Sequence, residues 1–202
     1  MDFFHTLLSI IFPPSKEEVL VASMSHESLV TRMNVRPIEH GTALFRYDDE
    51  IIRAIVWEVK YKKNPHAITL MANTLKKYIE ERHDEAPLLI PIPLSPKRMK
   101  ERGFNQVEEI LREVCNDPLF QFNSTILTRV RETIPQTQLS RKQRLTNLSG
   151  AFGVSESMRG RIKDAHLILV DDVATTGTTL AEARRTLLRA GAHRVDTLAF
   201  AH

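Results

Sequence analysis

The sequence predicts an α/β fold whose open, mostly parallel sheet is flanked by helices. The first observation is that apolar runs of strand length alternate along the chain with amphipathic helical patterns. Such alternation favours a parallel sheet, because a helix carries the chain back to the start of the next strand. The second is the clear strand–helix–strand order of residues 166–170, 178–190 and 195–201. Ligands of such sheets bind at the carboxyl ends of strands, which points to residue 171.

The composition fits one soluble domain with a small appendage. The chain has 202 residues, of which 42% are hydrophobic and 26% are charged, and both values are ordinary for a globular protein. Its one cysteine, Cys115, excludes a disulfide scaffold and a thiolate zinc site, and it favours a reducing compartment. The net charge of +3 is compatible with a polyanionic partner but does not require one.

The N-terminal part has the least regular pattern. The apolar run at residues 3–12 is shorter than the ~20 residues that a membrane-spanning helix needs, and it lacks the positive start and small-residue cleavage site of an export signal. We predict that this run is a short helix packed on the body, that no segment spans a membrane and that the protein is cytoplasmic. Residues 15–46 contain turn formers but no repeat, and they are predicted as short strands or loops.

Two helices follow. An apolar stripe at helical spacing predicts the first over residues 48–59, with Asp48 as its N-cap. The second is predicted over residues 64–81, because Asn64 suits an N-cap and Pro65 suits the first helical position.

In the centre of the chain, the spacing of the apolar residues changes from one typical of a helix to one typical of a strand. Residues 88–93 form a continuous apolar run, which is expected of a strand buried on both faces. Its two prolines lack N–H donors, so this strand should lie at an edge or end early. The other elements predicted here are a loop, a helix over 105–115, a strand over 124–130, a mobile basic loop over 131–149 and a strand over 151–154.

The run LILVDDVATTGTTL at residues 167–180 carries the strongest chemical signal. Asp171 and Asp172 follow a buried strand and suit hydrogen bonds from the vicinal hydroxyls of a sugar. The small and hydroxylated residues after them lead into a helix N-terminus, whose unsatisfied amides hold phosphate well. A 5-phosphorylated ribose matches this arrangement. The alternative is a plain acidic turn before a helix, but such a turn does not require these residues in this order. The candidates for phosphate binding are Thr175, Thr176, Gly177, Thr178 and Thr179. The chain contains neither GxxxxGK[ST] nor GxGxxG, which excludes those nucleotide-binding loops.

This run resembles the phosphoribosyl pyrophosphate (PRPP) motif of type I phosphoribosyltransferases, and more closely that of the ComF family, a competence-associated branch of the fold. Further blocks in the family's order are ALFRYDDEIIRAIVWEVKYKKN (43–64), LLIPIPLSPKRMKERGFNQ (88–106) and QTQLSRKQRLTNLSGAF (136–152). The resemblance implies a phosphoribosyltransferase-like domain over residues 43–202 and an N-terminal appendage over residues 1–42. Family members commonly start with a cysteine zinc ribbon, which this chain lacks. We therefore expect the appendage to be a metal-free remnant of that ribbon or a hood, and we expect no zinc.

The resemblance also implies the parts of a site for PRPP with Mg²⁺. Asp171 and Asp172 would hold the ribose hydroxyls and stabilise the positive charge that develops as the C1–O bond breaks, and the threonine-rich turn would hold the 5-phosphate. Mg²⁺ would be bound through PRPP, with no protein side chain expected as its ligand. The implied pyrophosphate residues are Leu94, Ser95, Lys97, Arg98 and Arg102. Those of a loop that closes over the site are Arg141, Lys142 and Asn147, with Arg144 as a further catalytic residue. Taken alone, each basic cluster would be interpreted as solvated surface charge.

Three functions are compatible with these observations. The first is a ComF-like protein that binds Mg²⁺–PRPP and supports DNA uptake, transformation or recombination by handling single-stranded DNA, with DNA-uptake or recombination proteins as partners. The second is a phosphoribosyltransferase of nucleobase or other salvage, an enzyme of pentosyl transfer. The third is a non-catalytic PRPP sensor that acts through protein partners. Intact Asp171 and Asp172 fit sensing and turnover alike. Phe45 and Trp57 are expected as core or cover residues rather than as base-stacking platforms.

Overall fold

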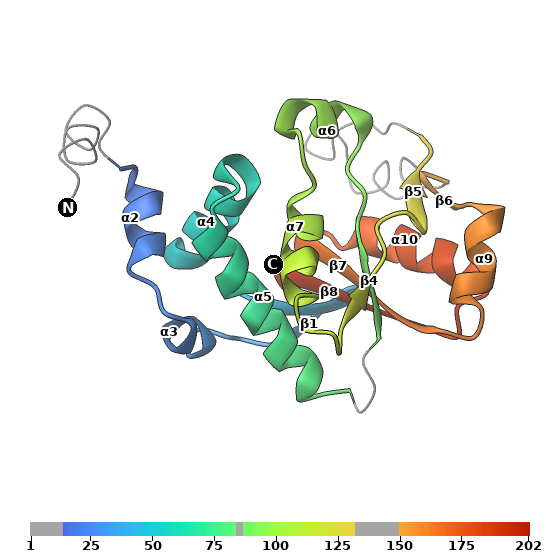
Figure 1. The fold of residues 1–202 in the computed structure, drawn as a ribbon, viewed down its shortest axis with the longest axis horizontal. Helices are drawn as coiled ribbons and strands as arrows, with labels where there is room; N and C mark the ends of the chain where they lie inside the picture. The colour runs from blue at the N-terminus through green and yellow to red at the C-terminus, as the bar shows by residue number, and fades with distance from the viewer. Residues whose placement is uncertain (1–13, 84–86, 132–149) are drawn as a thin grey trace.

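The computed structural model describes residues 14–83, 87–131 and 150–202. Its centre is a six-stranded sheet in the order β1-β2-β8-β7-β3-β4 (Figure 1). Neighbouring strands are parallel, except that β1 and β2 form an antiparallel pair. The predicted mostly parallel α/β sheet is therefore confirmed. The strands of this sheet are β1 (Arg36–Ile38), β2 (Gly41–Phe45), β3 (Leu88–Pro91), β4 (Gln121–Phe122), β7 (His166–Val173) and β8 (Arg194–Ala201).

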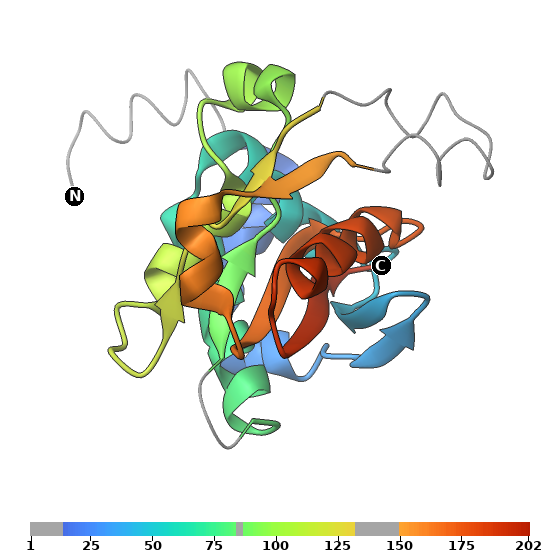
Figure 2. The ribbon, with the colours of Figure 1, turned by 90° about the vertical axis from the view of Figure 1, so that its right-hand side faces the viewer.

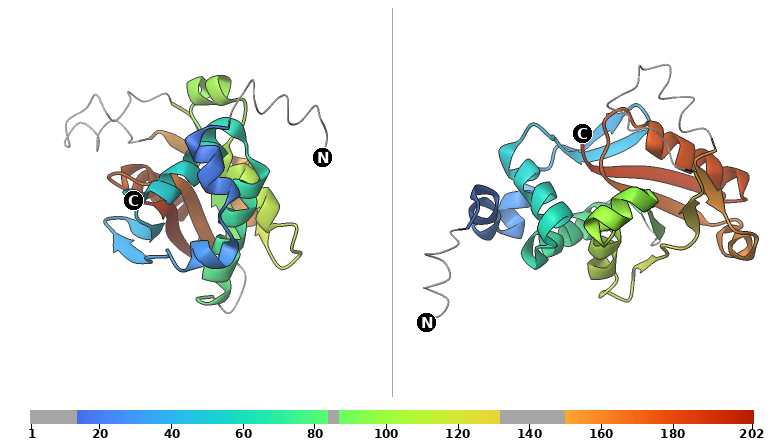
Figure 3. Two further views of the ribbon diagram at one scale, coloured as in Figure 1. Left: turned by 90° about the vertical axis from the view of Figure 1, so that its left-hand side faces the viewer. Right: turned by 90° about the horizontal axis from the view of Figure 1, so that it is seen from above.

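Helices cover both faces of the sheet (Figure 3). Side chains alternate between the two faces along each strand, so one strand contributes to two cores. In β7, Ile168 and Val170 join the core formed with α5 and α7, whereas Leu167 and Leu169 join the core formed with α10. The helices are α2 (Lys16–Ala22), α3 (His26–Val30), α4 (Glu50–Trp57), the π-helix η1 (Glu58–Lys62), α5 (Pro65–Glu80), α6 (Pro96–Arg102), α7 (Gln106–Val114), α9 (Glu156–Ile162) and α10 (Thr178–Arg189).

The predicted central helices are present, with local differences. Asn64 caps α5 by accepting hydrogen bonds from the amides of the first turn, as expected. The cap of α4 is Asp49 rather than Asp48, whose carboxylate pairs instead with Arg46. The chain continues from α4 into the π-helix η1, which ends at Lys63 in a left-handed conformation (φ 50°).

Several elements were missed because their signals are short. Residues 15–46 contain α2 and α3 in addition to strands, and Ser15 and Ser25 cap these helices. The loop predicted after residue 93 contains α6, which begins after Ser95. Helix α9 was not predicted at all.

The strands also differ in detail from their prediction. β3 ends early at Pro91, but it lies between β7 and the two-residue β4 rather than at the edge. The strand predicted over residues 124–130 shortens to β5 (Leu127–Arg129), which pairs with β6 (Phe152–Val154) in a separate ribbon. Figure 2 shows this yellow and orange ribbon leading into α9.

The N-terminal helices share the core of the rest of the chain. Val21 of α2 and Leu29 of α3 are fully buried in the cluster that contains α4 and α5. Phe45 is a core residue as expected, whereas Trp57 is 36% exposed and lies outside the core. The expected helix over residues 3–12 and most of the expected mobile loop, residues 132–149, lie outside the described residues. Within the described residues, no helix has the length and apolar character needed to cross a membrane. The division between residues 42 and 43 stays a prediction.

The start of α7 gives a test of how the sheet and this helix are joined. The Asn105 side chain is 6% exposed, caps α7 by accepting from Val107 N (3.0 Å), and donates to Ile92 O just beyond β3 (3.0 Å). We expect Asn105→Ala to lower the free energy of unfolding by about 2 kcal/mol, because it removes a cap and leaves a buried carbonyl unpaired. Urea denaturation measures this change. Ser95→Ala, which removes the exposed cap of α6, is the control and should cost at most about 1 kcal/mol. Equal losses for the two variants would contradict this role of Asn105.

Candidate functional site

Asp171 and Asp172 lie within the last part of β7 rather than in a turn after it. β7 continues to Val173, and Asp171 is paired in register with Ala199 of β8. Because successive strand residues point to opposite faces, Asp172 lies on the α7 side of the sheet and Asp171 on the α10 side. The two adjacent carboxylates therefore have different environments. Asp172 is 8% exposed, whereas Asp171 is half-buried.

Asp172 is held by groups from two other elements. Lys60 of η1 places its Nζ 3.0 Å from Asp172 Oδ2. Gln106, the first residue of α7, donates from Nε2 to the same oxygen. Both side chains of the Lys60–Asp172 pair are largely buried, so this ion pair is shielded from solvent. The other oxygen of Asp172 accepts from Val173 N.

Asp171 has fewer partners within the protein. Its Oδ1 accepts a hydrogen bond from Asp172 N at 2.9 Å. Burial raises the pKa of Asp171 to about 7, and the negative charge of Asp172 adds to this shift, while Lys60 and Arg98 oppose it. A carboxylate in this state gains from any cation or hydroxyl donor that reaches it, because such a group compensates its lost hydration.

The turn after β7 leads to the start of α10, which no side chain caps among the residues that the structure describes. Gly177 occupies the N-cap position of α10 with a left-handed φ of 66°, whereas α4, α5 and α7 each begin with a capping Asp or Asn. Thr178 is largely buried, Thr175 is exposed, and the Thr176 and Thr178 hydroxyls are hydrogen-bonded. Among the described residues, no side chain at the N-cap position caps α10, and such a helix start suits an anion.

Helix α6 brings two of the predicted basic residues toward the carboxylates. Arg98 and Arg102 line a cavity of about 370 Å³ together with Lys60, Tyr61 and Glu101. Arg102 Nη1 also donates to Gln106 Oε1 (2.9 Å), so it is linked through Gln106 to Asp172. Figure 1 shows α6 projecting above the end of the sheet.

The remaining predicted residues have varied positions. Lys97 is 74% exposed and lies near Glu101 of its own helix. Ser95 is the N-cap of α6, accepting from Arg98 N, and Leu94 is half-buried just before it. The residues predicted for the closing loop, Arg141, Lys142, Arg144 and Asn147, lie outside the described residues.

Sequence reasoning assigned no role to two residues that contact the carboxylate pair. Lys60 belongs to the KYKKN end of the block at residues 43–64, and Gln106 ends the GFNQ run. Their presence in blocks that resemble the family was the available signal. The contact itself needs the fold, because Lys60, Gln106 and Asp172 lie far apart in the sequence.

Comparison with known proteins identifies the family of the chain. Residues 100–202 match the phosphoribosyl transferase domain family, which is half of the chain. The DNA utilization protein YhgH of Escherichia coli O157:H7 is 39% identical over 108 residues, covering 54% of this chain and 46% of that protein. Competence protein F of Haemophilus influenzae is 33% identical over 108 residues, covering 54% and 47%.

A third relative extends the match toward the N-terminus. Competence protein ComFC of Bacillus subtilis is 31% identical over 150 residues, covering 73% of this chain and 51% of that protein. The chain thus spans about half the length of these curated relatives. From the matched domain and these relatives, we conclude that the chain belongs to the phosphoribosyl transferase domain family and, within it, to the ComF family.

Proposed function

We propose that this protein binds Mg²⁺–PRPP at the carboxyl end of β7 and that it serves DNA uptake or utilization. One observation carries the proposal: the carboxylate of Asp171 lies on the same face of the sheet as α10, and within the described part of the chain it accepts one backbone hydrogen bond while the N-terminus of α10 has no side-chain cap. A ribose 5-phosphate has hydroxyl donors at one end and an anion at the other. The site offers an acceptor and an anion-binding helix start in the matching order.

The chemistry of the residues also fits Mg²⁺. This ion prefers oxygen ligands, keeps several waters and is commonly held by one or two carboxylates together with substrate phosphates. Asp171 supplies a carboxylate with few partners, and Arg98 and Arg102 supply positive charge for a pyrophosphate group nearby. When bound, Mg²⁺ would neutralise charge that develops on the pyrophosphate leaving group.

Lys60 and Gln106 are assigned a positioning role. They hold the carboxylate of Asp172 on the α7 side, which keeps its negative charge close to Asp171. By fixing Asp172 they would hold the end of β7, and with it Asp171, in position for the ribose.

We also propose that the end of α4 and the π-helix η1 contact single-stranded DNA. Trp57 is 36% and Tyr61 57% exposed, and their ring centroids lie 5.5 Å apart. Lys62 lies over the Trp57 ring and Arg102 over the Tyr61 ring. Exposed aromatic rings interleaved with cations suit a strand whose bases stack and whose phosphates are neutralised. Tyr61 and Arg102 also line a cavity together with Lys60, the ion-pair partner of Asp172, which would place the strand near the PRPP site.

A titration with Mg²⁺–PRPP tests the role of Asp171. We expect Asp171→Asn to weaken binding about tenfold or more at pH 8, because it removes a charged acceptor for the ribose hydroxyls. Isothermal titration calorimetry measures the affinity. Asp164→Asn is the matched control and should bind like the wild type, because Asp164 is exposed and its positive φ of 58° tolerates asparagine.

The same titration has an expected pH dependence. The pKa of Asp171 is raised to about 7, so its carboxylate ionises as the pH rises from about 6 to 8, and wild-type affinity should increase over this range. Ionisation of the ligand's own phosphates affects wild type and Asp171→Asn alike, so the difference between the two proteins isolates this residue. Parallel pH profiles would contradict the role given to Asp171.

Gly177 tests the contact between the phosphate and the turn. A Cβ at this position would lie 3.3 Å from the Cβ of His40, and φ is positive. We expect Gly177→Ala to destabilise the fold by about 1 kcal/mol and also to weaken PRPP binding, because the turn must shift. Gly191→Ala, at a positive φ with open space around it, should destabilise without changing PRPP affinity. Denaturation measures the stability of both variants, and calorimetry measures their affinity for PRPP. An equal loss of PRPP affinity in the two variants would contradict the contact between the phosphate and this turn.

Intrinsic fluorescence tests the DNA surface directly, since Trp57 is the one tryptophan of the chain. Binding of an oligo-dT strand should quench this fluorescence through stacking. Tyr61→Ala should weaken binding at least about fivefold, because base–aromatic stacking is worth about 1–3 kcal/mol per base. Tyr47→Ala, which removes an exposed tyrosine outside η1, is the control. Binding without quenching, or equal affinities of the two variants, would exclude this surface.

A further inference from the structure

A second cluster of side chains with ligand chemistry lies at the opposite end of β7. His83 follows the end of α5, His166 is the first residue of β7, and Asp196 belongs to the neighbouring strand β8. One ligand atom from each of these residues lies within 4.8 Å of the other two. His166 Nε2 and Asp196 Oδ2 are 2.8 Å apart, and the rings of His83 and His166 have centroids 5.3 Å apart. Three segments that are distant in sequence therefore place two imidazoles and a carboxylate together.

We propose that His83, His166 and Asp196 bind one zinc ion. Two histidines and one carboxylate are a donor set that zinc uses in three-ligand sites, in which the fourth position is left to water or another ligand. The proposal is independent of the PRPP site, because residue 166 precedes Asp171 by about 16 Å along an extended strand. It also differs from a cysteine ribbon, since none of the donors is a thiolate.

Zinc binding requires a small separation of the His166 and Asp196 atoms and an approach of the His83 ring. Zinc bonds of about 2.0–2.1 Å in a tetrahedron separate neighbouring ligand atoms by about 3.3 Å. The His166 and Asp196 atoms are already closer than that, and they share a proton in a hydrogen bond. Zinc would bind Nε2 in place of this hydrogen bond, and a neutral His166 would then carry its one ring proton on Nδ1. His83 lies beyond the last residue of α5, and its ligand atom, within 4.8 Å of the other two, would move closer to complete the site.

Arg194 holds the carboxylate of Asp196 in such a site. Its Nε lies 3.2 Å from Asp196 Oδ1 and its Nη2 lies 2.9 Å from Asp196 Oδ2. Ligand carboxylates are commonly oriented by hydrogen bonds of this kind. The positive charge of Arg194 opposes a second cation, so the affinity depends on Asp196 remaining ionised and on the two imidazole nitrogens.

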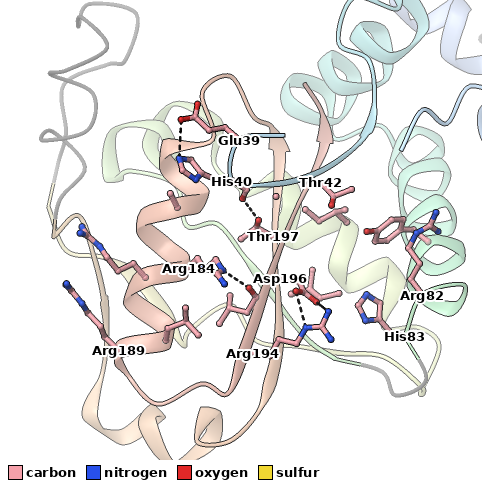
Figure 4. Close-up of a pocket in the computed structure, with 18 residues that line it drawn as sticks. Glu39, His40, Thr42, Arg82, His83, Arg184, Arg189, Arg194, Asp196 and Thr197 are labelled. Carbon is pink, nitrogen blue, oxygen red and sulfur yellow. Dashed lines mark hydrogen bonds and ion pairs between the residues drawn. The ribbon is translucent and has the colours of Figure 1, made fainter. Parts of the chain in front are cut away.

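A cavity gives access to the fourth position. His83 and Asp196 line a cavity of about 770 Å³ between α10, the β1–β2 hairpin and the end of α5. Figure 4 shows His83 and Arg82 approaching from one side while Arg194 and Asp196 project toward them from β8. The cavity is also lined by Arg184, and its arginines favour an anion, such as inorganic phosphate, over water as the fourth zinc ligand.

The experiment uses the full chain without a histidine tag and the metal alone as probe. Competition with a chromophoric chelator should show one zinc per chain. His83→Ala and Asp196→Asn should each weaken zinc binding at least about tenfold, because each removes one of three protein ligands. His202→Ala and Cys115→Ser, which remove donors outside the cluster, should leave the affinity unchanged. Circular dichroism establishes that each variant is folded.

Two further readouts need no variant. Co²⁺ as a substitute should give the strong visible absorption of a four-coordinate site, and addition of inorganic phosphate should change that spectrum if the fourth position faces the arginines. Zinc should raise the thermal midpoint of the wild type, because it binds the folded state and joins three distant segments. Absence of stoichiometric zinc binding, or unchanged affinity in folded His83→Ala and Asp196→Asn, would overturn the proposal.

Discussion

The buried carboxylate of Asp172 is the constraint on which the arrangement of the site depends. A carboxylate in the interior is costly unless it has a charged or hydrogen-bonding partner. Here those partners are Lys60 and Gln106, which come from η1 and from the first residue of α7. The π-helix and the cap of α7 therefore have to be placed where they are for the end of β7 to be stable. The N-cap of α7 is joined to the sheet by the hydrogen bond that the Asn105 side chain donates to Ile92 O, just beyond β3.

The same constraint separates the roles of two neighbouring carboxylates. Asp172 has its partners within the protein, whereas Asp171, on the other face of the strand, accepts one backbone hydrogen bond and has a raised pKa. Two identical side chains in adjacent positions thus differ because a strand alternates its faces. This division leaves Asp171 beside the start of α10, whose amides attract an anion.

The two ends of β7 and β8 carry different functional groups. The carboxyl ends carry the acidic pair and the cations of η1 and α6, while the amino ends carry His166 and Asp196 near His83. α10 lies between them, since its first turn belongs to the former site and its later turns line the cavity next to the latter. A ligand bound at either end would therefore lie against β7, β8 or α10, which also contribute to the site at the other end.

Local pattern in the sequence was enough for the parallel sheet, the cap at Asn64 and the carboxylates at 171 and 172, because these depend on periodicity and on residues close together in the chain. The short helices α2, α3 and α6 were missed, since a single serine cap over five to seven residues is a weak signal. Only the tertiary structure joined Lys60 and Gln106 to Asp172, exposed Trp57 and brought His83 to His166. The physical reason is that these contacts link segments from different elements, and their distances are set by how helices pack on the sheet rather than by any local preference of the chain.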